Sequence, residues 1–215
     1  MALKFGETKG SAQKSSVDSY KYVDGTNKVR LVGDVVARYV YWLKGENNKD
    51  IPFECLAFNR GEERFDNSEK DWVKEYHPDL KCGWAYAVQI IDPTDGKVKV
   101  MNLKKKLFSA IIDLAGDLGD PTDFQNGWDV IFTKEKTGPL PINVEYKLQP
   151  IKCQKAVRPL TADELELVAD LKSMDEVLPR PTPDDQKKLL DKLRSGGSKE
   201  SVDEEIVEQE FNISE

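Results

Sequence analysis

Side chains that could support catalysis are scarce in this sequence. It contains a single histidine, His77, and no phosphate-binding loop, dinucleotide-binding glycine motif or nucleophile-elbow motif. Three carboxylates on strand-like segments, Asp34, Glu54 and Asp92, are the candidates for holding a catalytic metal ion, as in a metal-dependent nuclease. Their spacing does not show that they converge. We therefore expect no enzymatic activity, and the metal-dependent nuclease stays as an alternative.

The cysteines include the chemical types of a zinc site. Cys55 and Cys82 with His77 could supply ligands, and Cys153 is the third thiol, but no Cys-x-x-Cys pair places two ligands on one turn. We expect no metal and no cofactor, with Cys55, His77 and Cys82 as the ligands if zinc binds. An odd number of widely spaced thiols favours a reducing compartment over a disulfide framework.

Strand-like segments combine positive charge with aromatic rings. Binding of single-stranded DNA needs cations that follow the phosphates and aromatic faces on which bases stack without sequence preference. Because strand side chains alternate, about half of these aromatic residues should face the core. The candidate DNA-binding residues are Arg30, Arg38, Tyr39, Tyr41, Trp42, Lys44, Phe58, Arg60, Lys97, Lys99, Lys104 and Lys105.

Several strands must position these residues. Apolar and polar residues alternate through 29–43, where Gly33 marks a bulge or bend, and the turn at 92–96 joins two more strands into a hairpin. We expect residues 59–80 to form an insertion loop. The strands are expected at 29–34, 35–43, 51–58, 84–91, 97–101, 128–133 and 143–148.

Three helices are expected. Asn102 can cap the first, whose apolar stripe includes Leu107 and Ile111. Thr161 and Glu164 form a capping box that opens a helix running from about residue 162 to 177, and a short helix starts near residue 183. The sequence therefore predicts a β-rich α+β fold: an OB-fold-like Greek-key barrel with insertions, followed by two C-terminal helices and a flexible acidic tail.

Charge is distributed unevenly along the chain. Residues 195–215 hold one basic and seven acidic residues, so six of the seven net negative charges lie in this tail. We expect a flexible basic arm at 1–19, a nucleic-acid-binding core at 20–158, a helical extension at 159–194 and the acidic tail. A tethered polyanion competes with nucleic acid or recruits basic partners. With no apolar run long enough for a membrane span or a signal peptide, we expect a cytoplasmic protein that does not bind membranes.

Local motifs resemble those of a known family. Four segments carry the resemblance: the run from Trp84 to Pro93, the Gly96-Lys97-Val98 that follows it, the lysine-flanked helix at 104–112 and Val29-Arg30-Leu31. They resemble the single-stranded DNA-binding proteins of T-even-type tailed phages and their cyanophage relatives. The resemblance covers residues 28–155. It implies an OB-fold core that binds the DNA backbone in a positive cleft. The zinc ligands of the family's prototype find a counterpart only near Cys55, which disfavours zinc.

The resemblance also implies partners. It assigns self-association along DNA to the N-terminal arm, and contacts with replication and recombination proteins to the acidic tail. The expected function is a sequence-independent protein that coats and protects single-stranded DNA during phage DNA replication, recombination and repair. A non-enzymatic adaptor of a replication or transcription complex is the alternative.

Overall fold

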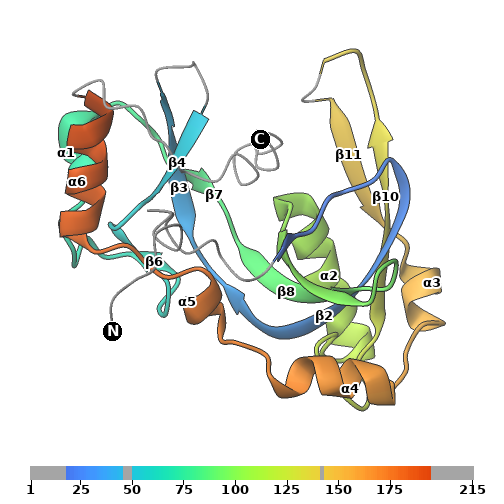
Figure 1. The fold of residues 1–215 in the computed structure, drawn as a ribbon. Helices are drawn as coiled ribbons and strands as arrows, with labels where there is room; N and C mark the ends of the chain where they lie inside the picture. Colours follow the sequence, from blue (N-terminus) through green and yellow to red (C-terminus); the bar gives the residue numbers. More distant parts are fainter. Residues whose placement is uncertain (1–17, 46–49, 141–142, 195–215) are drawn as a thin grey trace, which may run out of the picture.

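The computed structural model describes residues 18–45, 50–140 and 143–194 (Figure 1). The expected acidic tail and nearly all of the expected basic arm lie outside the described residues. The strands are β1 (Asp18–Ser19), β2 (Gly25–Val36), β3 (Tyr39–Lys44), β4 (Asp50–Glu54), β5 (Phe58–Asn59), β6 (Arg64–Phe65), β7 (Gly83–Trp84), β8 (Ala87–Asp92), β9 (Lys97–Asn102), β10 (Asp129–Lys136) and β11 (Val144–Leu148). The helices are α1 (Trp72–Tyr76), α2 (Lys105–Leu118), α3 (Pro150–Gln154), α4 (Ala162–Ala169), α5 (Met174–Val177) and α6 (Pro183–Arg194).

A six-stranded sheet forms the larger part of the fold. Its strand order is β1-β9-β8-β2-β10-β11, and the long strand β2 pairs antiparallel with both β8 and β10. Gly33 has φ +69°, and the register with β8 shifts between Val32 and Val36, so the expected bulge is confirmed. With its several helices, the chain has the predicted β-rich α+β character.

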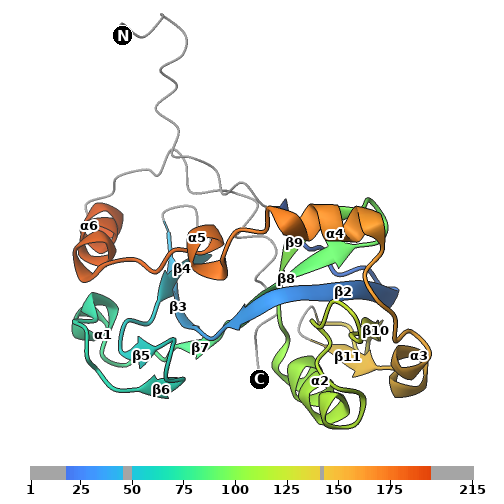
Figure 2. The ribbon, with the colours of Figure 1, turned by 90° about the horizontal axis from the view of Figure 1, so that it is seen from below.

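Helices cover both faces of this sheet (Figure 2). Side chains alternate along β2, so Val29 and Leu31 lie in the main core together with the apolar stripe of α2. Val32 lies on the opposite face of the sheet, where it packs with Leu160 and Val168. The expected stripe of α2 is confirmed, because Leu107 and Ile111 are its buried residues. The sheet therefore lies between α2 on one face and α4 on the other.

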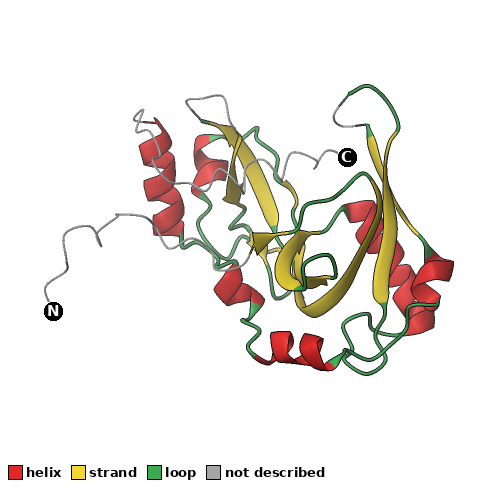
Figure 3. Ribbon diagram, turned by 45° about the vertical axis from the view of Figure 1, so that its right-hand side comes forward, coloured by secondary structure: helices red, strands yellow, loops and turns green. Residues whose placement is uncertain are grey.

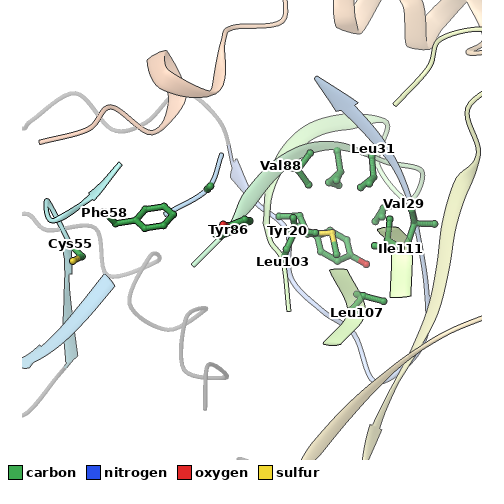
Figure 4. Close-up of a cluster of buried hydrophobic side chains, with 14 of the residues drawn as sticks. Tyr20, Val29, Leu31, Cys55, Phe58, Tyr86, Val88, Leu103, Leu107 and Ile111 are labelled. Carbon is green, nitrogen blue, oxygen red and sulfur yellow. The ribbon is translucent and has the colours of Figure 1, made fainter. Parts of the chain in front are cut away.

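A smaller sheet continues the chain beyond β2. Its strand order is β4-β3-β7, and a two-stranded sheet, β5-β6, lies next to it. Helices α1 and α6 pack against each other beside these strands, and Figure 3 shows the helices on two sides of the strands and below them. Tyr86 lies between Phe58 of the smaller part and Leu103 of the larger part (Figure 4). One continuous core therefore joins the two sheets.

The segment 59–80 is not a loop, contrary to expectation. It contains β6 and α1, and its Asp71 and Val73 are buried. The Asp71 carboxylate caps α1 through the backbone N–H of Lys74 and also accepts hydrogen bonds from the backbone of Leu56 and Ala57. Periodicity did not reveal this segment, because its helix has only five residues and its buried Asp71 is held by the backbone of Leu56 and Ala57, which follow β4.

Two helix boundaries also differ from the expectation. The helix expected at 162–177 is divided into α4 and α5, because Ser173 and Glu176 form a second capping box that starts a new helix. Asn102 is the last residue of β9, and α2 begins at Lys105. The capping box of Thr161 and Glu164 is confirmed. Within the described ranges, the helices are too short or too polar to cross a membrane.

Candidate nucleic-acid interface

Five aromatic side chains form a continuous row between the two sheets. We call Tyr39, Phe65, Trp84, Tyr86 and Phe108 the aromatic row. Ring centroids are 5.1 Å apart for Tyr39 and Phe65, 6.3 Å for Tyr39 and Trp84, and 5.8 Å for Trp84 and Phe108. Trp84 and Tyr86 are stacked, with centroids 3.5 Å apart and ring planes inclined by 13°. The row thus connects the β5-β6 hairpin to the first turns of α2.

Strand pairing places the row. Tyr39 is the direct partner of Trp84 in the β3-β7 pair, which brings their rings to one face of the sheet. Phe65 is 52% exposed, and Tyr39, Trp84 and Phe108 are partly exposed. Tyr86 is buried, and its hydroxyl donates a hydrogen bond to the Glu63 carboxylate at 3.0 Å. The exposed faces offer apolar planes on which nucleobases can stack.

The N-terminus of α2 adjoins this row and attracts anions. Its N-cap residue, Lys104, makes no side-chain capping hydrogen bond, and the first turn carries no acidic residue. Lys105 and Lys106 occupy that turn and are exposed. Backbone N–H groups in the first turn of a helix have no partner within the helix, and together with the positive end of the helix dipole they add to the charge of the two lysines. A phosphate group is the complementary ligand, and Phe108 lies one turn further along.

Lys104 itself has a different role. It is buried, and its ammonium lies 5.5 Å from the ring centroid of Tyr22 and 5.8 Å from that of Tyr146. Burial raises the pKa of Tyr22 well above its ordinary value, and it raises that of Tyr146 to about 12, so both phenols stay neutral. Lys104 therefore stabilises the packing at the start of α2 by cation–π contact.

Arg38 anchors the aromatic row. Its Nε donates to the Ala85 carbonyl at 2.9 Å and its Nη2 to Asn102 Oδ1 at 3.1 Å. These bonds connect Arg38, which lies between β2 and β3, to Ala85 just before β8 and to Asn102 at the end of β9. Ala85 lies between Trp84 and Tyr86, so the bond from Arg38 fixes the backbone between these two rings.

Most of the other expected cations are engaged with acids. Arg30 is only 2% exposed, its Nη1 lies 3.9 Å from Oδ1 of the Asp129 carboxylate, and its Nη2 donates to the backbone carbonyl of Asp123 at 2.7 Å. Arg60 binds both carboxylate oxygens of Glu54, at 2.6 and 2.7 Å. Lys99 pairs with Asp92 at 2.7 Å and with Asp95 at 2.8 Å. We leave these three out of the proposed interface, because their charges are already balanced.

The remaining expected residues divide into three groups. Tyr41 and Phe58 are buried in the core, where Tyr41 contacts Asp71 and Cys55. Trp42 and Lys44 line a pocket at the far end of β3. Lys97 is exposed on the β8-β9 hairpin. The buried ring of Phe58 nevertheless packs against Tyr39, with centroids 4.7 Å apart, so Phe58 supports the aromatic row from the core side. Of the predicted residues, Arg38 and Tyr39 are thus next to each other in this region, and Lys104 and Lys105 lie at the start of α2, whose Phe108 belongs to the row.

Expected metal ligands do not gather among the described residues, where no group of three His, Cys, Asp or Glu side chains could hold a metal ion. Cys55 and Cys82 do meet: the hydrogen bond between their thiols raises the pKa of Cys55 and lowers that of Cys82. His77 lies on the surface at the end of α1.

The nuclease candidates are dispersed as well. Glu54 is neutralised by Arg60 and Arg180, and Asp92 by Lys99. Asp34 is exposed on β2.

Part of the interface was not predicted from the sequence. Phe65 lay in a segment read as a loop, and Trp84, Tyr86 and Phe108 were recognised only as strand or helix residues. One signal was available: Trp84 and Tyr86 are two positions apart on an extended segment, which places both rings on one side.

Comparison with known proteins identifies one relative. The chain is 29% identical, over 232 aligned positions that cover 91% of this chain and 88% of the relative, to a protein of Escherichia phage T5 described as a probable ssDNA-binding protein. This relative supports the expected similarity to phage single-stranded DNA-binding proteins, but not the narrower T-even and cyanophage group. No family model matches the chain.

Proposed function

We propose that this protein binds single-stranded DNA without sequence preference and without catalysis. The observation that carries the proposal is the aromatic row running into the uncapped, lysine-rich N-terminus of α2. It provides the two components that single-strand binding needs, planar apolar faces and a site for phosphates, on one continuous surface. The similarity over nearly the full length to the phage T5 protein supports the same function.

The chemistry of the row explains the lack of sequence preference. Every base has a π-face that can stack on Tyr39, Phe65 or Trp84, and each such stack contributes about 1–3 kcal/mol. Lys105 and Lys106 bind the phosphates, which are the same in every sequence. Arg38 fixes the backbone between the rings of Trp84 and Tyr86, and Lys104 stabilises the start of α2. Both act as positioning residues and do not contact the DNA in this proposal.

The larger sheet supports an OB-type core as part of this proposal. Strand β2 pairs with β8 and β10, β8 pairs with β9, β10 pairs with β11, and α2 lies between β9 and β10 in the chain. This sequence of pairings is the one expected of an OB barrel. A pairing of β9 with β11, which would close the barrel, is absent from the described part of the chain.

We extend the proposal to the protein's role. The protein would coat and protect single strands during phage DNA replication, recombination and repair, in the cytoplasm of the host cell. The basic arm would promote self-association along DNA. The acidic tail, with its negative charge and interspersed apolar residues, would bind replication and recombination proteins and compete with DNA for the cations.

Tryptophan fluorescence tests the proposal directly. The full chain and a chain ending at Arg194 are titrated with an oligothymidylate at low and at high salt. We expect quenching that weakens steeply as salt rises, because each phosphate contact contributes about −0.7 to the slope of log affinity against log salt. The shorter chain should bind more tightly, because it lacks six net negative charges. Absence of quenching and of any other binding signal in both chains would refute the proposal.

A further inference from the structure

A surface pocket of about 720 Å³ lies at the end of β3 that is distant from the aromatic row. Three parts of the chain form it: the last residues of β3, the end of α1 with the segment that follows, and the last turn of α6. The volume falls in the range of pockets that bind small organic ligands. None of the functions assigned so far accounts for this pocket.

The lining combines flat rings with positive charge. Trp42 and Lys44 are two positions apart on β3, so both side chains leave the strand on the same face. Opposite them, the Arg194 guanidinium lies 4.7 Å from the ring centroid of Tyr76. Trp42 and Tyr76 supply aromatic surface, and Lys44 and Arg194 supply charge at the rim.

Further polar groups complete the lining. His77 and Asp79 add a nitrogen heterocycle and a carboxylate, and Lys44 forms an ion pair with Asp50 at 2.7 Å. A ligand for this pocket therefore needs a planar ring, an N–H donor and a negatively charged group. A nucleotide has all three.

Resting on the proposed function, we infer that this pocket takes one nucleotide of the bound single strand. Its base packs against Trp42, its phosphate lies beside the Arg194 guanidinium, and Asp79 accepts a hydrogen bond from an N–H group of the base. Tyr39 begins the same strand, and at about 3.3 Å per residue Trp42 lies about 10 Å further along it. Side chains at these two positions point to opposite faces. The pocket is therefore a subsite separate from the aromatic row, and the DNA reaches it by passing around the Lys44 end of β3.

The first test compares two tryptophans. In Trp42→Phe, titration with oligothymidylate should give a smaller total quenching than in the wild-type chain, because a stacked base no longer meets an indole in the pocket. Trp72→Phe is the matched control, since the indole of Trp72 is flanked by Lys70 and Lys187 at 4.9 and 5.2 Å and does not line the pocket. Equal quenching in Trp42→Phe and the wild-type chain would overturn the inference.

The second test removes a charge and does not depend on tryptophan. Arg194→Ala should reduce the magnitude of the salt slope by about 0.7, the contribution of one phosphate contact. Lys188→Ala removes the same charge from the same helix, outside the pocket, and should leave the slope unchanged. Equal slopes for the two variants would count against a phosphate at Arg194.

The outcomes separate this inference from the proposed function. If the wild-type chain does not bind oligothymidylate, the proposed function fails. If it binds and the pocket variants match their controls, only the inference fails. If Arg194→Ala alters binding in the full chain but Lys44→Ala and Trp42→Phe have no effect in a chain ending at Arg194, the acidic tail is the occupant of the pocket, and the inference is again overturned.

Discussion

The indole of Trp84 lies flat against the phenol ring of Tyr86, with centroids 3.5 Å apart. One face of the indole is therefore occupied within the protein, and a base can stack only on the other. Tyr86 is fixed from behind, because its hydroxyl binds Glu63 and the backbone N–H of Leu103 donates to its carbonyl at 2.7 Å. The stack thus presents a rigid platform next to α2. Rigidity lowers the entropy lost when a flexible single strand binds.

Phe65→Ala tests the exposed end of the aromatic row. Phe65 is 52% exposed, so its removal should affect stability little and weaken single-strand binding by about 1–3 kcal/mol, the contribution of one base stack. Fluorescence anisotropy with a labelled oligonucleotide measures the change. Phe124→Ala, at a phenylalanine that is 42% exposed outside the row, serves as the control and should bind like the wild-type chain. Equal affinities for all three proteins would remove Phe65 from the interface.

The start of α2 is tested by Lys105→Ala together with Lys106→Ala. Both lysines are exposed in a first turn without acidic residues, so the double variant should bind more weakly and lose about 0.7 of salt slope for each lost phosphate contact. The corresponding control removes Lys152 and Lys155, which are exposed in and directly after α3. A slope that falls equally in both double variants would indicate a general charge effect without a site at α2.

Gln186→Ala should destabilise the fold. Gln186 is 2% exposed, its Nε2 donates to the Glu54 carbonyl at 2.9 Å, and its Oε1 accepts from the backbone N–H of Trp72 at 2.7 Å. Truncation removes the partner of the buried Glu54 carbonyl and of the partly buried Trp72 N–H, and a buried group left without its partner costs about 1–3 kcal/mol. Urea unfolding should show a loss of about 2–4 kcal/mol, whereas Lys188→Ala on the exposed side should change the free energy of unfolding by less than about 0.5 kcal/mol. A Gln186→Ala variant as stable as the wild-type chain would show that these two hydrogen bonds do not stabilise the packing of α6 against β4 and α1.

Glu164 makes stability depend on acid pH. Hydrogen bonds from Arg158, at 2.6 and 2.7 Å, lower the pKa of Glu164 from 4.5 to about 2. Because the pKa is lower in the folded state, the carboxylate contributes its full stabilisation above about pH 4.5 and loses it as the pH falls toward 2. Free energies of unfolding measured across this range should decline less steeply for Glu164→Gln than for the wild-type chain. Glu166→Gln, at an exposed glutamate two positions further along α4, should retain the wild-type decline.

Much of the local structure follows from the sequence alone. The hairpin of β8 and β9, the apolar stripe of α2 and the capping box of Thr161 and Glu164 were predicted and confirmed, because each depends on residues close together in the chain. The uneven distribution of charge between body and tail is likewise a property of the sequence. These features were sufficient to indicate a β-rich α+β protein.

The tertiary structure decided which of the candidate residues remain available to a ligand. Arg30, Arg60 and Lys99 match the chemistry of a phosphate contact, but folding places carboxylates beside them, and a paired cation offers little to a phosphate. Arg180 pairs with Glu54 across 126 positions, a contact that no local pattern predicts. Phe65 joins Tyr39 only because the segment 59–80 folds back on β3. The residue types and their periodicity could therefore be predicted from the sequence. Which side chains are exposed, and which cations are paired with carboxylates, depends on which distant segments come into contact in the folded chain.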